Sequence, residues 1–185
     1  MPESYRNESP LFWPIVRLKE AYLRGDLSPV EVLEEAILRA DEYNPSLNAY
    51  LERLDEQARL QARKAESFFM GPSKEIPSLC GIPISITDTF ELKGSFTTYG
   101  SAFFRENLTK EDHDLVRRLR LSGAVFTGKT NTPEFAQSAT TENRLGDDAR
   151  NPWNTSYTPG GSSGGAAASV SAGLVTAAIG ADGGG

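Results

Sequence analysis

The 185-residue sequence contains a single cysteine, a single histidine and no long apolar run. The lone Cys80 excludes an internal disulfide bond and suits a reducing compartment. One histidine and one cysteine cannot supply the usual ligand sets of a zinc site, so we expect no metal. No apolar stretch approaches the roughly 20 residues that a membrane-spanning helix requires, so we expect no membrane partner.

Basic residues are also in the minority, because 19 Lys and Arg stand against 25 Asp and Glu. The net charge of -6 argues against a large nucleic-acid face, which needs clustered cations, so we expect no direct nucleic-acid partner. The one basic group, Arg117, Arg118 and Arg120, is typical of the wet face of a helix. Residues 1–7 lack the basic start and apolar core of a signal peptide, which predicts a cytoplasmic protein.

The first third of the chain has the pattern of helices. Ser28 and Glu31 have the spacing of a capping box, with Pro29 at the first helical position. Apolar residues then recur on one face until Asn44-Pro45, where we expect the helix to end. A second helix is predicted to run to Gly71-Pro72, with one apolar side made of Leu51, Leu54, Ala58, Ala62, Ala65 and Phe69.

Short apolar runs bounded by Gly and Pro follow, and they predict strands at 82–86 and 124–126. A helical segment at 115–121 lies between them, and this alternation indicates an α/β layer arrangement. The Gly/Ser tract after Pro159 continues into a small-residue helix at 166–172 and a buried strand at 174–179, so it is not a flexible linker. No internal repeat and no domain boundary is visible.

Two motifs suggest other chemistries. Residues 123–130 fit the Walker A pattern letter for letter, but a phosphate cradle needs a loop after a strand and before a helix. Here residues 124–126 read as the strand itself and Pro133 follows closely, so a nucleotide binder is the least favoured alternative. The only histidine, His113, lies in a charged stretch typical of a solvated helix start, which leaves a Ser-His-Asp site poorly supported.

A series of short motifs runs in one order along most of the chain. They are Gly81–Ile86, Thr98–Ser101, Gly123–Val125, Gly128–Asn131, Asn151–Trp153, Gly160–Gly165 and Asp182–Gly185. In this series the sequence resembles the amidase signature family. The resemblance implies the N-terminal part of an α/β/α fold with a mixed central sheet, preceded by two to three helices. It also implies that residues 1–185 form a single, C-terminally truncated amidase domain.

The resemblance also implies roles for individual residues. Ser162 matches the family's bridging serine, which follows a cis peptide bond and passes a proton between lysine and nucleophile, with Ser163 as a supporting partner. Gly183, Gly184 and Gly185 match the turn whose N–H groups form the oxyanion hole, next to a supporting Asp182. Residues 135–138 would face the acyl pocket, with Ala136 and Ser138 as substrate-binding positions.

Two departures from the family pattern concern the catalytic groups. The family's nucleophilic serine would be the residue directly after Gly185. The family's catalytic lysine falls at Thr87, which has no amine and cannot act as the general base. Lys93 lies at a different offset along the chain, so it is not expected to replace that lysine, and Lys129 is expected to be structural.

The resemblance implies an amidase that hydrolyses the carboxamide C–N bond of a small molecule without a cofactor, although this chain alone should be inactive. Two alternatives stay open beside it: an amidotransferase subunit that works with tRNA-linked partners, and a catalytically dead amide-binding module. Self-association into a homodimer also stays open.

We expect the coding sequence to continue from Gly185 into a serine codon, because the family's nucleophile directly follows the glycine turn. Sequencing the adjacent coding region tests this expectation. A stop codon at that point would favour a degenerate pseudoenzyme or one half of a split protein.

Overall fold

The computed structural model describes residues 9–71 and 75–184. Helices fill the N-terminal third, and strands alternate with helices after it. In chain order the elements are η1 (Pro10–Phe12), α2 (Ile15–Arg24), α3 (Pro29–Leu47), β1 (Tyr50–Arg53), α4 (Asp55–Met70), β2 (Pro83–Thr87), η2 (Ala102–Phe104), α5 (Asp114–Leu121), β3 (Val125–Thr130), η3 (Glu134–Ala136), α6 (Gly164–Ser171) and β4 (Ala177–Ile179). No described helix has the length and apolar character needed to cross a membrane.

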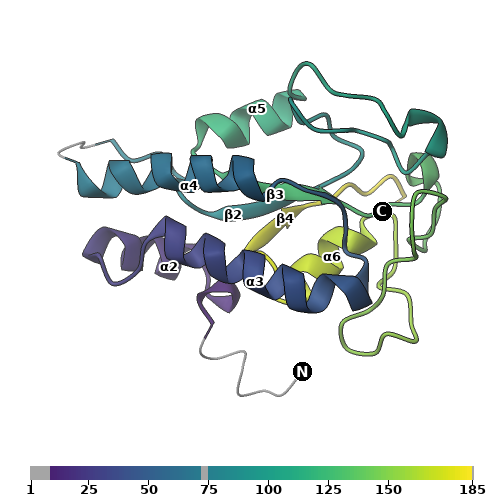
Figure 1. Cartoon of the computed structure of the whole chain (residues 1–185), viewed down its shortest axis with the longest axis horizontal. Helices are drawn as coiled ribbons and strands as arrows, with labels where there is room; N and C mark the ends of the chain where they lie inside the picture. The colour runs from purple at the N-terminus through teal and green to yellow at the C-terminus, as the bar shows by residue number, and fades with distance from the viewer. Residues whose placement is uncertain (1–8, 72–74, 185) are drawn as a thin grey trace.

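The sheet has the strand order β1-β3-β2-β4. β1 runs antiparallel to β3, whereas β3 and β4 both run parallel to β2, so the sheet is mixed as expected. Figure 1 shows α5 above the strands and α6 below them, which confirms the layered α/β fold. Because β2, β3 and β4 are parallel, their carboxyl ends meet at one edge of the sheet. Ligands commonly bind at this edge in α/β folds.

Two expected boundaries in the helical third were wrong. α3 begins as predicted, with Ser28 and Glu31 bonded in a reciprocal capping box, but it continues through Pro45 to Leu47. Pro45 removes one helical hydrogen bond and its ring crowds the carbonyl four residues earlier, but only two residues of α3 follow it, so little of the helix depends on that turn. Leu51 belongs to β1 and not to α4; its position fits the helical period by coincidence.

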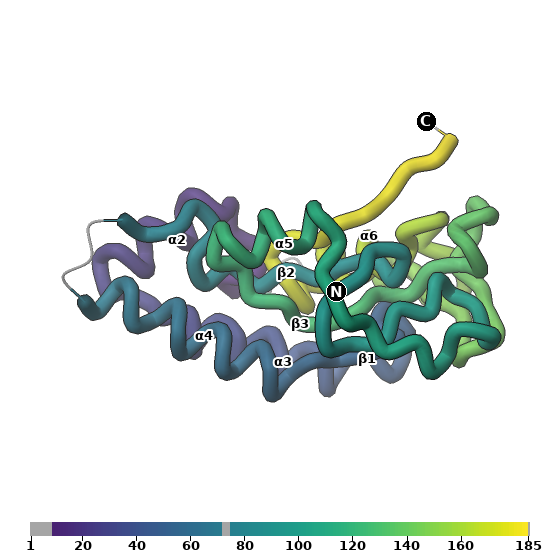
Figure 2. Tube along the Cα trace, turned by 90° about the horizontal axis from the view of Figure 1, so that it is seen from above, coloured from purple at the N-terminus to yellow at the C-terminus, as the bar shows by residue number. Residues whose placement is uncertain are grey.

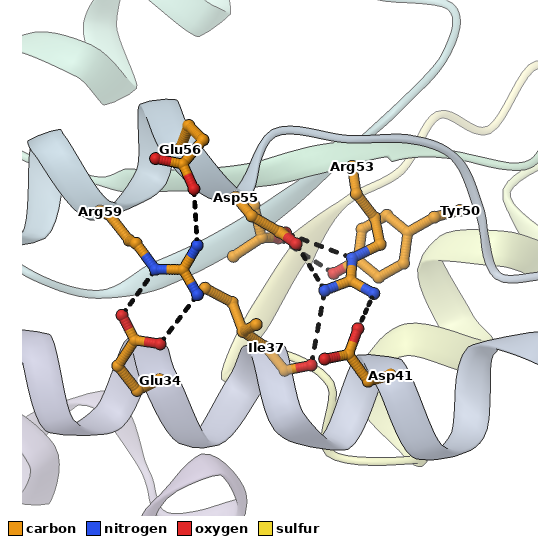
Figure 3. Close-up of polar contacts among 9 residues, drawn as sticks. Glu34, Ile37, Asp41, Tyr50, Arg53, Asp55, Glu56 and Arg59 are labelled. Atoms are coloured by element: carbon orange, nitrogen blue, oxygen red, sulfur yellow. Dashed lines mark hydrogen bonds and ion pairs between the residues drawn. The ribbon is translucent and has the colours of Figure 1, made fainter.

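α3, β1 and α4 are joined by two arginine clusters, which Figure 3 shows in close-up. The guanidinium of Arg59 bridges Glu34 of α3, at 2.7 Å, and Glu56 of α4, at 2.9 Å. Its hydrogen bonds lower the pKa of Glu34. Arg53 of β1 contacts Asp41 and Asp55 in the same way. Such partly exposed pairs contribute little free energy each, so the apolar packing between the helices carries most of the stability of this region.

The main core lies between the sheet and the helices around it. Most of its buried members come from α2, α3, α5, β2 and β3, and they include Leu18, Tyr22, Val32, Ile84, Val116 and Phe126.

Lys129, the lysine of the Walker-like pattern, is fully buried in β3. Its Nζ lies 2.6 Å from a carboxylate oxygen of Asp88 and 2.9 Å from the hydroxyl of Thr97. Asp88 also accepts hydrogen bonds from the N–H and the hydroxyl of Thr98. Burial lowers the pKa of Lys129, and Asp88 opposes this shift. A strand residue committed to a buried ion pair cannot belong to a phosphate loop, so the nucleotide-binding alternative is excluded.

Replacing Lys129 with Met should destabilise the protein by about 3 kcal/mol, because the charge of Asp88 is left buried without its partner. The free energy of unfolding in urea, followed by circular dichroism, measures the effect. Lys93→Met is the matched control, since the side chain of Lys93 is exposed, and should change stability by no more than about 0.5 kcal/mol. Equal losses in the two variants would refute a special role for the buried pair.

Candidate active site

A cleft of about 460 Å³ opens at the carboxyl edge of the sheet. Three chain segments far apart in the sequence line it: the segment after β3, the glycine-rich loop before α6, and the turn after β4. Figure 2 shows this last segment, in yellow, extending away from the rest of the chain. The lining residues are Ala136, Gln137, Ser138, Ala139, Gly161, Ser162, Asp182, Gly183 and Gly184. The cleft therefore brings together most of the residues that the family resemblance singles out.

Ser162 lies in the loop that leads into α6, and the peptide bond that precedes it is cis. Its backbone carbonyl accepts a hydrogen bond of 3.1 Å from the hydroxyl of Thr132, which follows β3. Thr141 holds the loop at both ends: its hydroxyl donates to the carbonyl of Gly160 at 2.7 Å and accepts from the N–H of Gly164 at 3.1 Å. The loop is therefore fixed by side chains from the preceding segment.

Two glycines let this loop and α6 approach other backbone segments closely. A Cβ on Gly161 would lie 2.7 Å from the carbonyl oxygen of Ser138. A Cβ on Gly165 would lie 2.4 Å from the backbone nitrogen of Asn131, whose carbonyl accepts the N–H of Gly165. Both distances are too short for any side chain. Glycine at these positions is thus a condition for placing Ser162 beside the end of β3.

The turn after β4 is attached to the same loop. The hydroxyl of Ser163 accepts a hydrogen bond of 2.9 Å from the N–H of Ala181, so Ser163 links the two sides of the cleft. Gly183 and Gly184 are exposed and line the cleft. The N–H of Gly184 donates to a carboxylate oxygen of Asp182 at 3.0 Å, so in this conformation Asp182 occupies one of the three expected donors. Gly185 lies outside the described residues.

The wall that carries Ala136 and Ser138 has a constrained backbone. Phe135 and Ala136 have φ values of 52° and 56°, in the left-handed region that such residues seldom adopt. The N–H of Phe135 donates to the carbonyl of Tyr99 at 2.7 Å. One residue earlier, the carboxylate of Glu134 accepts a hydrogen bond of 2.6 Å from the hydroxyl of Ser101. These bonds hold the wall in its unusual conformation.

Thr87 ends β2 and is fully buried. Side chains alternate along a strand, so Thr87 projects to the same side as Ser85, whose hydroxyl lies 2.9 Å from that of Ser169 in α6. Thr87 thus faces the layer of α6. Its hydroxyl has no hydrogen-bond partner among the described residues, and neither has that of Thr130, its neighbour in the register of β3.

Neither of the two lysines considered from the sequence supplies an amine to the cleft. Lys93 is exposed and its backbone N–H donates to Asp112, whereas Lys129 is buried against Asp88. His113 accepts the N–H of Leu115 and caps α5, as its charged surroundings indicate. The described part of the chain holds no group of three His, Cys, Asp or Glu residues placed to bind a metal.

The sequence did not predict the role of Thr132 and Thr141, which hold the glycine-rich loop that carries Ser162. The only signal for Thr132 was its position directly after the Gly-Lys-Thr-Asn run, where a buried strand ends. Thr141 gave no signal, because its contacts with Gly160 and Gly164 span about twenty residues of irregular chain.

Comparison with known proteins agrees with the fold. The family model described as Amidase matches residues 31–185, so the chain belongs to the amidase family. It is 40% identical over 171 residues to one of the subunits of the glutamyl-tRNA(Gln) amidotransferase of Persephonella marina, covering 92% of this chain and 35% of that protein. The chain thus spans about a third of the length of the curated relatives that it matches.

Solved structures show the same relationship. The chain superposes with a TM-score of 0.88 on a fatty acid amide hydrolase, at 26% identity, covering 98% of this chain and 32% of that one. A 6-aminohexanoate cyclic dimer hydrolase complexed with substrate gives a TM-score of 0.81 at 33% identity, covering 91% of this chain and 34% of the other. The likeness therefore extends over nearly the whole of this chain.

Replacing Gly165 with Ala should lower the free energy of unfolding by at least about 1 kcal/mol, because overpacking against Asn131 outweighs the better helix propensity of alanine. Urea unfolding of the purified variant measures the change. Gly146→Ala is the control, since no atom lies within 4 Å of its added Cβ. A stabilised Gly165→Ala protein would contradict the close approach described above.

Proposed function

We propose that the protein acts on carboxamides and that its cleft is the part of a serine amide-hydrolase site that holds the relay and the oxyanion donors. One observation carries the proposal: Ser162 and the Gly183-Gly184 turn line the same cleft although they are well separated in the sequence. Membership of the amidase family supports the reaction class.

Each group would have a distinct task at the scissile amide. The backbone N–H groups of Gly183 and Gly184 would donate to the carbonyl oxygen as it gains negative charge. For Gly184 this requires its N–H to leave Asp182. The hydroxyl of Ser162 would pass a proton to or from the attacking serine, which the resemblance puts directly after Gly185. Ala136 and Ser138 would contact the acyl part of the substrate.

Besides the nucleophile, which would follow Gly185, this arrangement lacks a base. A serine nucleophile needs a proton acceptor, and neither the buried hydroxyl of Thr87 nor any lysine lining the described part of the cleft provides one. We therefore propose that the cleft can bind an amide but does not turn it over in this chain.

The 185-residue chain should show no hydrolysis of a simple aryl amide such as 4-nitroacetanilide, followed by the absorbance of released 4-nitroaniline. Benzamide, added at millimolar concentration, should nonetheless shift the amide NMR signals of Gly161, Ser162 and Gly183. Hydrolysis that disappears in Ser162→Ala would overturn the assignment of an inactive site. Unchanged spectra would overturn the assignment of an amide cleft.

Restoring an amine at position 87 should restore turnover where the nucleophile is present. In the full-length gene product with serine after Gly185, Thr87→Lys should raise kcat/KM for aryl amides by at least about 100-fold, the usual range for a positioned general base. Thr87→Met is the control, because it has similar bulk and no amine. Equal activity of the Lys and Met variants would show that position 87 has no part in proton transfer.

A second candidate function is that of one subunit in an amidotransferase, and the 40% identity to the glutamyl-tRNA(Gln) amidotransferase protein of Persephonella marina favours it. In that case the full-length protein should co-purify with other subunits and release ammonia from glutamine only with them. Glutaminase activity of the isolated protein would argue against it. The homodimer and the cytoplasmic location stay predictions.

A further inference from the structure

A second cleft, of about 310 Å³, is lined in part by residues of α4 and of the end of α5. Cys80, Gly123 and Ala124 are part of its lining, and they directly precede β2 and β3. The cleft therefore lies at the amino-terminal edge of the sheet, opposite to the edge that carries Ser162. Its volume is at the lower end of the range of about 300–1,000 Å³ that is usual for small-molecule sites.

The walls of this α4–α5 cleft are apolar. Ala65 and Phe68 contribute from α4, and Leu121 contributes from the end of α5. Leu121 leaves 72% of its surface exposed. An exposed leucine and a half-buried phenylalanine in one cleft give an apolar ligand a surface to cover.

The charged side chains of the cleft are both cations. Lys64 and Arg120 line it, and no Asp or Glu does, although acidic residues outnumber basic ones in the chain. Lys64 forms no ion pair within residues 9–71 and 75–184. The amide oxygen of Gln61 accepts the N–H of Phe126 at 2.8 Å, which leaves the NH₂ group of Gln61 as a donor.

Arg120 is held in place before any ligand arrives. Its Nε and one terminal nitrogen donate to Asp112 at 2.6 and 2.9 Å, and its guanidinium lies 5.0 Å from the centre of the Phe126 ring. Hydrogen bonding from Arg120 lowers the pKa of Asp112, so this pair stays charged at neutral pH. The second terminal nitrogen of Arg120 has no partner among the described residues and is a fixed donor in a cleft that Lys64 also lines.

We propose that the α4–α5 cleft binds a monocarboxylate with an aromatic or aliphatic tail. The carboxylate contacts Lys64, the free terminal nitrogen of Arg120 and the NH₂ group of Gln61, and no Asp or Glu lines the cleft to repel it. The tail covers Phe68, Ala65 and Leu121. The proposal is independent of the function assigned to the Ser162 cleft, because it uses no residue of that cleft.

Titration of the ¹⁵N-labelled chain with 4-phenylbutyrate tests the proposal by NMR. We expect a dissociation constant of the order of 1 mM, as its size allows, with shifts at Ala65, Leu121 and Gly123. 4-Phenylbutanol, which keeps the tail without the charge, should bind at least about fivefold more weakly. Inorganic phosphate, which keeps charge without the tail, should produce no saturable shifts at these positions.

Variants then separate this cleft from other sites. Lys64→Gln should weaken 4-phenylbutyrate binding about fivefold. Lys110→Gln, the same change at an exposed lysine outside the cleft, should leave binding unchanged, and so should Ser162→Ala. The proposal fails if Lys64→Gln binds like the parent, if phosphate competes with 4-phenylbutyrate, or if the shifts gather at 136–139 and 161–163.

Discussion

The constraint on which the cleft depends is the contact between the first turn of α6 and the end of β3. The N–H of Gly165 donates to the carbonyl of Asn131, and a Cβ on Gly165 would overlap the backbone there. This contact fixes where α6 starts, and the start of α6 fixes Ser162. The hydroxyl of Thr132, next to Asn131, then holds the carbonyl of Ser162. The position of the relay serine thus depends on main-chain packing that only glycine allows.

The parts of the fold that sequence reasoning captured are those determined by neighbouring residues. The capping box at Ser28 and Glu31 sets the start of α3 by local hydrogen bonds, and the structure confirms it. β1 was missed because a four-residue strand has no period of its own, and its pairing with β3 is a contact across about 75 residues of chain. The helix was wrongly predicted to end at Pro45, because the loss of helix stability that a proline causes depends on how many turns follow it.

In the cleft, too, the local motifs were predictable from the sequence and the long-range contacts were not. Its glycine-rich segments were recognisable as short motifs, and the structure brings their described residues to one place. The threonines that hold them, Thr132 and Thr141, act through contacts between loops without regular structure. No pattern of spacing encodes such contacts, so they become visible only in three dimensions.

Thr87 and Lys129 differ in whether their buried surroundings can stabilise a positive charge. Lys129 remains buried because Asp88 and the hydroxyl of Thr97 satisfy its ammonium. The hydroxyl of Thr87 has no hydrogen-bond partner among the described residues, and neither has that of Thr130, its register neighbour in β3. A neutral residue at position 87 therefore avoids the desolvation of a second buried cation. At position 87, folding stability favours a neutral side chain, whereas proton transfer requires an amine.

β4 has only three residues and forms one edge of the described sheet. Its outer backbone groups are free of partners in the strand order β1-β3-β2-β4, and its side chains are partly exposed. An edge of this kind is a template for adding another strand, whether from the same polypeptide or from a neighbouring molecule. At high concentration, we expect copies of the 185-residue chain to associate through the edge at β4. The short length of β4 limits each pairing to a few hydrogen bonds.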